Sequence, residues 1–113
     1  MEQINRIELL GTIGSVRTQV VGDKRVVNFT MATNRAYKNR EGDMVIETTW
    51  HNVAAWEGRN IPGDTLDQIE KGATAHVHGR MRTTKHSDRT FSEVVAASVE
   101  IIPCASLEEA ENA

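Results

Sequence analysis

Hydrophobic residues in this chain recur at every second position, which is the period of a β-strand that buries one face. Near the start of the chain, Ile7, Leu9 and Ile13 share one face, whereas Glu8 and Thr12 lie on the other. The same alternation returns in later segments, at residues 27–33, 46–56, 74–82 and 91–102. The body of the chain therefore predicts five strands rather than a bundle of helices.

Short polar signals separate these segments. Gly22-Asp23 stands where a two-residue turn would join the first two strands into a hairpin. The stretch from Asp64 to Gly72 opens with a capping-type aspartate, carries Lys71 late and ends on glycine, which predicts a helix of about two turns. Residues 85–88 are expected to form a loop between the last two strands.

The expected order is three strands, a short helix and two further strands. This is the order of the OB-fold, an all-β, five-stranded Greek-key barrel with one short helix between strands 3 and 4. Such barrels bind oligonucleotides or oligosaccharides on one strand face. Other small barrels fit the same pattern.

Size and composition predict one soluble domain. The 113 residues are enough to bury a core without a disulfide or metal staple, and the hydrophobic (39%) and charged (26%) shares are those of globular proteins. No apolar run approaches the ~20 residues that span a bilayer, so no membrane association is expected. The first residues lack a signal-peptide pattern and Cys104 is the lone cysteine, which predicts a cytoplasmic location.

Charge is unevenly distributed along the chain. The net charge is −3, but residues 103–113 carry only acidic charges, and the preceding residues have 13 acidic and 13 basic side chains. We therefore expect one domain at residues 1–102 and a short, acidic, flexible tail at 103–113. Two basic clusters lie within the domain, at residues 33–40 and 73–91. Such clusters are either solvated surface or contacts to nucleic acid.

Aromatic residues are few, and most of them are predicted to face away from the core. Trp50 and Trp56 share one face of the third predicted strand, Tyr37 falls in the loop after the second, and Phe29 faces the core. A base stacked on an exposed ring contributes roughly 1–3 kcal/mol whatever the base, which suits sequence-independent binding of single strands. The alternative is that the tryptophans fill a barrel end or a subunit contact.

Basic side chains near these rings would contact phosphates and release counterions. Arg35 and Lys38 flank Tyr37, and Arg80 and Arg82 share a strand face. The candidate phosphate contacts are Arg6, Arg35, Lys38, Arg80, Arg82 and Lys85.

The histidines give no recognisable metal or catalytic site. His76 and His78 point the same way on one predicted strand, as two metal ligands would, but the sequence offers no third ligand at a suitable spacing. His86, Asp88 and Ser92 have the residue types of a nucleophile site without the strand-to-helix turn that such a site needs. We therefore predict no enzyme activity, no metal and no cofactor.

Separated motifs stand at residues 5–11 (NRIELLG), 27–35 (VNFTMATNR), 47–53 (ETTWHNV), 71–72 (KG) and 78–83 (HGRMRT). Together they resemble the bacterial single-stranded DNA-binding protein family, over residues 4–102. The resemblance implies an OB-fold and a non-catalytic, sequence-tolerant protein that binds and protects single-stranded DNA in replication, recombination or repair. A primosome-type OB protein that acts mainly as a protein-binding scaffold is the alternative.

The resemblance also implies roles for individual residues. Bases would stack on Trp50, Trp56 and Tyr37, and on His86 in the loop between the last two strands, where the family has a stronger stacking surface. Phosphates would be met by Arg6, Arg35, Lys38, Arg82 and Lys85. Subunits would associate, usually into homotetramers, through the first strand and the outer barrel surface, with His51 at an interface.

The C-terminal residues depart from the family pattern. Family members usually end in an acidic tip with a terminal hydrophobic residue that recruits replication and repair proteins. Residues 103–113 carry Glu108, Glu109 and Glu111, but no aspartate run and no terminal phenylalanine. Recruitment of such partners is therefore not carried over to this chain.

Overall fold

The computed structural model describes residues 2–102, which form a closed barrel of five strands. The elements are β1 (Ile7–Val21), β2 (Lys24–Lys38), β3 (Met44–Trp56), α1 (Gly63–Asp67), β4 (Thr74–His86) and β5 (Arg89–Ile102). The strands close in the order β1-β2-β3-β5-β4, and the helix lies between β3 and β4 in the chain. This is the five-stranded barrel of the OB-fold, as predicted. The expected tail at 103–113 lies outside the described residues.

The alternation of hydrophobic residues marks the inner face of the barrel. Ile13, Val27, Met31, Val53 and Val77 are almost completely buried and pack together. They come from the first four strands, and β5 adds its own residues to the same cluster. Phe29 is also buried, as predicted. Burial of one face of each strand therefore fixes the register of the sheet, because a slip of one residue would expose that face.

β1 takes part in two sides of the barrel. Residues 7–12 pair antiparallel with β4, and residues 12–21 pair antiparallel with β2. The register with β2 shifts between Ile13 and Val16, so that two residues of β1 stand opposite Thr30 alone. The backbone N–H of Ser15 donates to Oγ1 of Thr30 at 2.9 Å within this bulge. A bulge bends a strand, which allows β1 to turn from one neighbour to the other.

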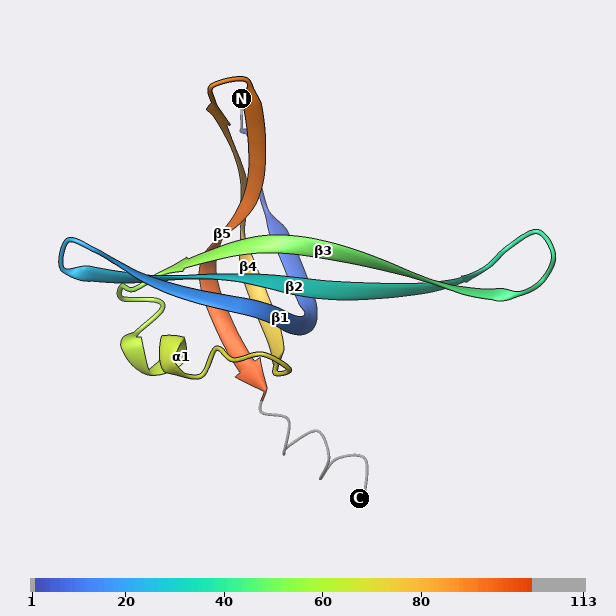
Figure 1. The fold of residues 1–113 in the computed structure, drawn as a ribbon, viewed down its shortest axis with the longest axis horizontal. Coiled ribbons are helices and arrows are strands. Elements are labelled where there is room, and N and C mark those ends of the chain that lie inside the picture. Colours follow the sequence, from blue (N-terminus) through green and yellow to red (C-terminus); the bar gives the residue numbers. More distant parts are fainter. Residues whose placement is uncertain (1, 103–113) are drawn as a thin grey trace, which may run out of the picture.

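Three hairpins extend beyond the body of the barrel (Figure 1). In the first, Val21 pairs with Lys24 around the predicted Gly22-Asp23 turn, and Gly22 has a positive φ of 66° that glycine adopts without strain. The longest pairs β2 with β3 from Val26 and Trp56 to the turn at residues 39–43. The third joins β4 to β5 and leaves the barrel in a different direction (Figure 1).

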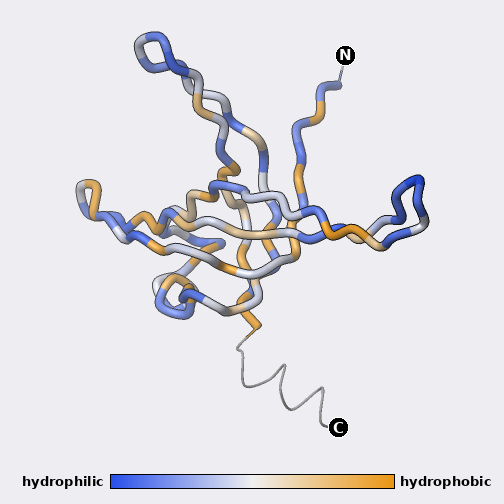
Figure 2. The backbone as a smooth tube through the Cα atoms, turned by 45° about the vertical axis from the view of Figure 1, so that its right-hand side comes forward, coloured by the Kyte–Doolittle hydropathy of each residue, from blue (hydrophilic) through white to orange (hydrophobic). Residues whose placement is uncertain are grey.

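The tips of the two longer arms are hydrophilic. Figure 2 shows hydrophilic colour at the β2–β3 and β4–β5 turns, whereas hydrophobic colour appears in the barrel body and also at the β1–β2 turn. In the β2–β3 turn, Oδ1 of Asn39 accepts hydrogen bonds from the backbone N–H groups of Glu41 and Asp43, at 3.0 Å and 2.9 Å. The β4–β5 turn contains only Ser87 and Asp88, because His86 pairs with Arg89. The predicted loop at 85–88 is therefore wrong in its first half, since Lys85 and His86 belong to β4.

The helix is shorter than the sequence predicted. α1 has five residues, begins after Pro62, and has no side-chain hydrogen bond at its N-cap. Asp64 lies in the first turn and is not the cap, which corrects the prediction. Leu66 is buried against the barrel core, so packing of this side chain holds the segment in place. In the part of the chain that the structure describes, no helix has the length and apolar character needed to cross a membrane.

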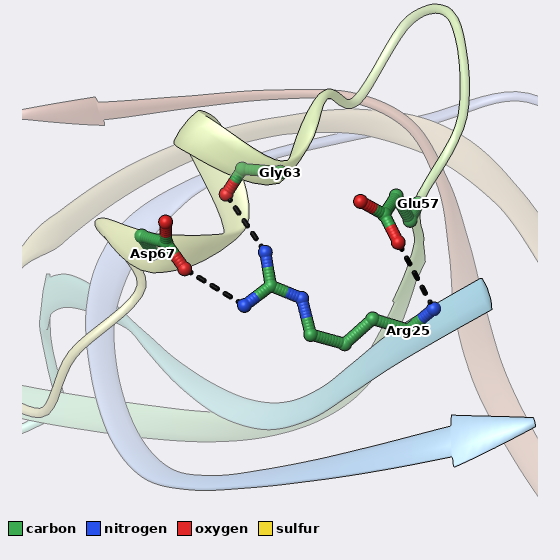
Figure 3. A network of polar contacts seen from close by, with 4 residues as sticks. All are labelled: Arg25, Glu57, Gly63 and Asp67. Atoms are coloured by element: carbon green, nitrogen blue, oxygen red, sulfur yellow. Dashed lines mark hydrogen bonds and ion pairs between the residues drawn. The ribbon is translucent and has the colours of Figure 1, made fainter. Parts of the chain in front are cut away.

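Arg25 connects the helix to the sheet (Figure 3). Its guanidinium bonds Oδ1 of Asp67 at 2.7 Å and the backbone oxygen of Gly63 at 3.0 Å. Its backbone N–H donates to the carboxylate of Glu57 at 3.2 Å, and its backbone oxygen accepts from the N–H of Glu57 at 2.8 Å. The residue that follows Trp56 is therefore fixed to β2, and one arginine orients the segment between β3 and β4.

Candidate nucleic-acid interface

Trp50 presents most of its ring to solvent from the middle of β3. Its side chain points away from the barrel interior, and the residue is 62% exposed. One edge of the ring rests on β1, since a Cβ on Gly14 would stand 2.6 Å from Cζ3 of Trp50. The indole is therefore supported on one side and open on the other. A ring held in this way offers a flat surface for a stacked base.

Trp56 lies on the same face of β3 but at its far end. The residue is 38% exposed and borders a recess formed by Gly58, Arg59, Asn60, Ile61, Ala96 and Ala97. Trp56 follows Trp50 by six positions along the strand, which is about 20 Å at ~3.3 Å per residue. Stacked bases are about 3.4 Å apart, so bases on the two rings would be separated by several nucleotides.

Tyr37 lies in β2 and not in a loop, which corrects the prediction from the sequence. It pairs with Val45 on the part of the hairpin that extends beyond the barrel, and it is 38% exposed. The guanidinium of Arg35 lies 5.5 Å from the centroid of the tyrosine ring, within cation–π range. Tyr37 points to the same side of β2 as Phe29, whereas Trp50 points to the opposite side of the sheet. The β2–β3 hairpin thus carries an aromatic ring on each of its two faces.

The predicted basic residues fall into three groups on different strands. Arg35 and Lys38 lie on the β2–β3 hairpin, on opposite faces by parity. Arg82 and Lys85, together with His86, lie on the β4–β5 hairpin. The third group is Arg80 on β4 and Arg6, which immediately precedes β1.

Asn5 brings the third group together. Its side-chain amide donates to the backbone oxygen of Met81 at 2.7 Å and accepts from the backbone N–H of Met81 at 3.0 Å. Since Ile7 pairs with Gly79, these bonds extend the register and place Arg6 beside Arg80. The structure therefore brings these two arginines close to each other, although 74 positions separate them in the sequence.

Arg82 has an acidic partner inside the same hairpin. Its guanidinium bonds the carboxylate of Glu93, which is its register partner on β5. A phosphate would have to compete with this carboxylate for the guanidinium. Sequence reasoning named Arg82 as a phosphate contact but did not foresee this neighbour.

A cleft of about 540 Å³ lies between the barrel body and the β4–β5 hairpin. Its walls come from the bulged part of β1, from β2 and β3, and from the start of β5; they include Asn28, Thr30, Asn52, Phe91 and Glu93. Asn52 lies between the two tryptophans on the outer face of β3. The cleft therefore joins the tryptophan face of β3 to the β4–β5 hairpin.

Phe91 is a site residue that the sequence analysis did not select. It is 53% exposed and lines the cleft from β5, where it pairs with Thr84. An exposed phenylalanine beside polar groups is a stacking surface of the same kind as the tryptophans. A signal for it was present in the sequence, as an aromatic residue within the basic segment 73–91.

Comparison with known proteins identifies the family of this chain. The model of the Single-strand binding protein family matches residues 4–103. This chain belongs to that family. The single-stranded DNA-binding protein 1 of Chlorobaculum tepidum is 26% identical over 107 residues, which are 88% of this chain and 65% of that protein. A mitochondrial single-stranded DNA-binding protein of Danio rerio is 31% identical over 96 residues, 78% of this chain and 65% of the relative.

Solved structures show the same fold for members of this single-strand binding family. A Plasmodium falciparum SSB complex with ssDNA has a TM-score of 0.75 at 24% identity, over 91% of this chain and 97% of that one. A deletion mutant of the single-stranded DNA binding protein from Thermus aquaticus has a TM-score of 0.73 at 19% identity, over 89% of this chain and 51% of that one. The chain spans somewhat less than two thirds of the length of the curated relatives given above.

A further polar cluster lies outside the predicted site, between β1 and β4. Glu8 on β1 contacts both His76 and His78 on β4. A hydrogen bond from His76, followed by the charge of His78, lowers the pKa of the Glu8 carboxyl. The sequence analysis found no third ligand beside the two histidines, and the structure corrects that premise by supplying Glu8.

Proposed function

We propose that this chain binds single-stranded DNA without strong sequence preference and protects it. The observation that carries the proposal is the pair of outward-facing indoles on β3, of which Trp50 is 62% exposed. A large apolar ring that stays exposed contributes no hydrophobic stabilisation to the fold. A base stacked on the ring covers it and stabilises the complex by roughly 1–3 kcal/mol. Membership of the single-strand binding family supports the same function.

The arrangement of side chains suggests how a strand would lie. Bases would stack on Trp50 and Trp56, with Phe91 reached through the cleft and Tyr37 on the opposite face of the hairpin. Phosphates would be met by basic residues of the three groups, namely Arg6, Arg35, Lys38, Arg80, Arg82 and Lys85. His86 would contribute a smaller stacking surface at the β4–β5 tip. Because the two hairpins leave the barrel in different directions, the strand would wrap around the barrel rather than follow one groove.

Such binding needs no chemical reaction, so a non-catalytic role in replication, recombination or repair is part of the proposal. The relatives from Chlorobaculum tepidum and Danio rerio are named single-stranded DNA-binding proteins, which supports that role. A cytoplasmic location and a division into a domain at 1–102 and a tail at 103–113 belong to the same proposal.

We further propose that four copies of the chain form a homotetramer. The segment of β1 at residues 7–10 pairs with β4 on one edge, and its register with β2 begins only at Thr12. An edge of this kind, with Leu10 exposed beside it, is a surface to which a second copy can add. His51, half-buried and bonded to Thr33 at 2.9 Å, would lie at an interface. Light scattering coupled to size exclusion would give the number of chains directly.

The decisive experiment is a titration of tryptophan fluorescence with oligo(dT) of increasing length, at two salt concentrations. Duplex DNA of the same length is the control. We expect strong quenching by the single strand only, and an affinity that falls with salt at about −0.7 in log–log slope for each phosphate neutralised. If neither DNA alters the emission and a separate binding assay detects no complex, the tryptophan face belongs to a protein interface, as in the scaffold alternative.

A further inference from the structure

The cleft between the barrel and the β4–β5 hairpin brings together side chains of three different kinds. Its volume of about 540 Å³ lies within the range of small-molecule sites, which is roughly 300–1,000 Å³. The ring of Phe91 lines it from β5, the amides of Asn28 and Asn52 line it from β2 and β3, and Arg17 lines it from β1. A ring, two amides and a guanidinium are groups that contact the face of a base, its polar edge and a phosphate, respectively.

The register of the sheet places the two amides side by side. Asn28 pairs with Ala54 on β3, and Asn52 precedes Ala54 by two positions on the same strand. Residues related in this way are diagonal neighbours on one face of the sheet, about 7–8 Å apart. Asn52 lies between Trp50 and Trp56 on the outer face of β3. A strand that runs from one indole to the other therefore passes the two amides.

Both amides are available to a ligand. Within residues 2–102, neither side chain forms a hydrogen bond, whereas the amides of Asn5, Asn34 and Asn39 each form at least one. A side-chain amide has one acceptor oxygen and two N–H donors, so it can pair with the polar edge of any base. Two asparagines therefore suit a site that holds a base by its edge without selecting its identity.

Arg17 supplies a positive charge that the sequence analysis did not select. It is exposed on β1, beyond the bulge, and it stands directly opposite Asn28 on β2. Among the described residues 2–102 it forms no ion pair, whereas the guanidinium of Arg82 is bonded to Glu93. A phosphate can therefore bind Arg17 without displacing a carboxylate from it.

We propose that the cleft binds one nucleotide of the single strand, between the nucleotides stacked on the two tryptophans of β3. Its base stacks on Phe91, and Asn28 and Asn52 form hydrogen bonds with the edge of that base. Arg17 binds its phosphate. This inference rests on the proposed binding of single-stranded DNA and adds to it a contact through the edge of a base. The site uses the part of β1 that pairs with β2, and not the β1 edge at residues 7–10, so it is compatible with the proposed tetramer.

Hydrogen bonding to the base edge can be tested with a thymine isostere. Difluorotoluene has the shape and the stacking face of thymine but lacks its hydrogen-bonding edge. Fluorescence anisotropy would compare oligo(dT) with an oligonucleotide of the same length in which difluorotoluene replaces every thymine. The full chain is expected to bind the isostere about three- to tenfold less tightly, because hydrogen bonds from two amides are lost. In Asn52→Leu, the affinity for oligo(dT) should fall about threefold, and the difference between the two oligonucleotides should shrink by a similar factor.

Two controls remove similar groups outside the cleft. Gln19→Leu removes an exposed amide from β1, two positions beyond Arg17, and should leave both affinities unchanged. Arg17→Ala should reduce the slope of log affinity against log salt by about 0.7, because one phosphate contact is lost. Lys24→Ala removes an exposed positive charge at the tip of the same hairpin and should leave the slope nearly unchanged.

The outcomes separate this site from the proposed function as a whole. If the full chain binds neither oligonucleotide, the proposed DNA binding is wrong and the nucleotide site falls with it. If the chain binds oligo(dT) but Asn52→Leu keeps the affinities of the parent, the strand bypasses the amides and only the inference about the cleft is overturned. Equal salt slopes in Arg17→Ala and Lys24→Ala would likewise overturn the phosphate contact. Asn52 is exposed, so its replacement leaves the core intact and the comparison reports on binding.

Discussion

The indole of Trp50 lies directly against the backbone of Gly14. A methyl group on Gly14 would stand 2.6 Å from Cζ3 of Trp50 and 2.8 Å from Oγ1 of Thr30. Thr30 lies on β2, opposite the bulge of β1, and accepts a hydrogen bond from the backbone of Ser15. The position of the exposed ring on β3 is therefore set by a glycine two strands away.

Gly14→Ala is expected to push the ring of Trp50 outward, because the side chain can move into solvent and the paired backbone cannot. We expect the free energy of unfolding to fall by about 1 kcal/mol from overpacking. The affinity for oligo(dT) should fall about three- to tenfold, since part of the stacking energy of roughly 1–3 kcal/mol is lost. Emission in a Trp56→Phe background, where Trp50 is the lone tryptophan, would report the movement.

Gly58→Ala is the matched control, because a Cβ at Gly58 would have no atom within 4 Å. This variant should leave the Trp50 emission and the affinity unchanged. If Gly14→Ala behaves in the same way as Gly58→Ala, the indole does not rest on β1.

The barrel could be predicted from the sequence because the residues of a strand that face the core are hydrophobic, and they recur at every second position. Leu9, Val27 and Val53 each belong to such an alternating segment, since each lies on the inner face of its strand. Tyr37 was placed in a loop because the signal ends where the barrel ends. Beyond that point the hairpin is solvated on both faces, and it is held extended mainly by cross-strand hydrogen bonds. Such pairing leaves no pattern of hydrophobic residues to read.

Bulges and long-range register explain the features of the site that the sequence did not reveal. Val99 and Ile101 point inward, and counting back by twos from them would turn Phe91 inward as well. The register between β4 and β5 shifts near His78, which reverses the parity and turns Phe91 outward. The contact of Glu8 with His78 likewise depends on the pairing of β1 with β4, which no local spacing encodes.

Phe91→Ala is expected to weaken oligo(dT) binding by about 1–3 kcal/mol, because it removes a stacking surface from the cleft. The salt dependence should stay nearly constant, since a ring releases no counterion. Fluorescence anisotropy of a labelled oligonucleotide over a salt series measures both quantities. Val20→Ala, at an exposed position of the β1–β2 hairpin, is the control. Equal affinities for the two variants would remove Phe91 from the interface.

Arg25→Ala is expected to lower the free energy of unfolding by about 1 kcal/mol, because it removes a partly screened ion pair with Asp67 and a hydrogen bond to Gly63. Urea denaturation followed by circular dichroism measures the change. Lys24→Ala removes a charge of the same sign at the adjacent position and should have a smaller effect. A loss of the same size in both variants would mean that the contacts of Arg25 add nothing to stability.

Glu93 is expected to weaken DNA binding through Arg82, because its carboxylate occupies the guanidinium that would meet a phosphate. Glu93→Gln should therefore raise the affinity for oligo(dT) and steepen its salt dependence, whereas Arg82→Ala should lower the affinity and reduce the slope by about 0.7. In the double variant, the gain from Glu93→Gln should be smaller than in the parent, since there is no arginine left to release. Anisotropy titrations of the four proteins form a complete cycle. If the effects of the two substitutions simply add, the ion pair does not regulate phosphate contact. An unchanged salt slope in Arg82→Ala would mean that this arginine does not contact the DNA.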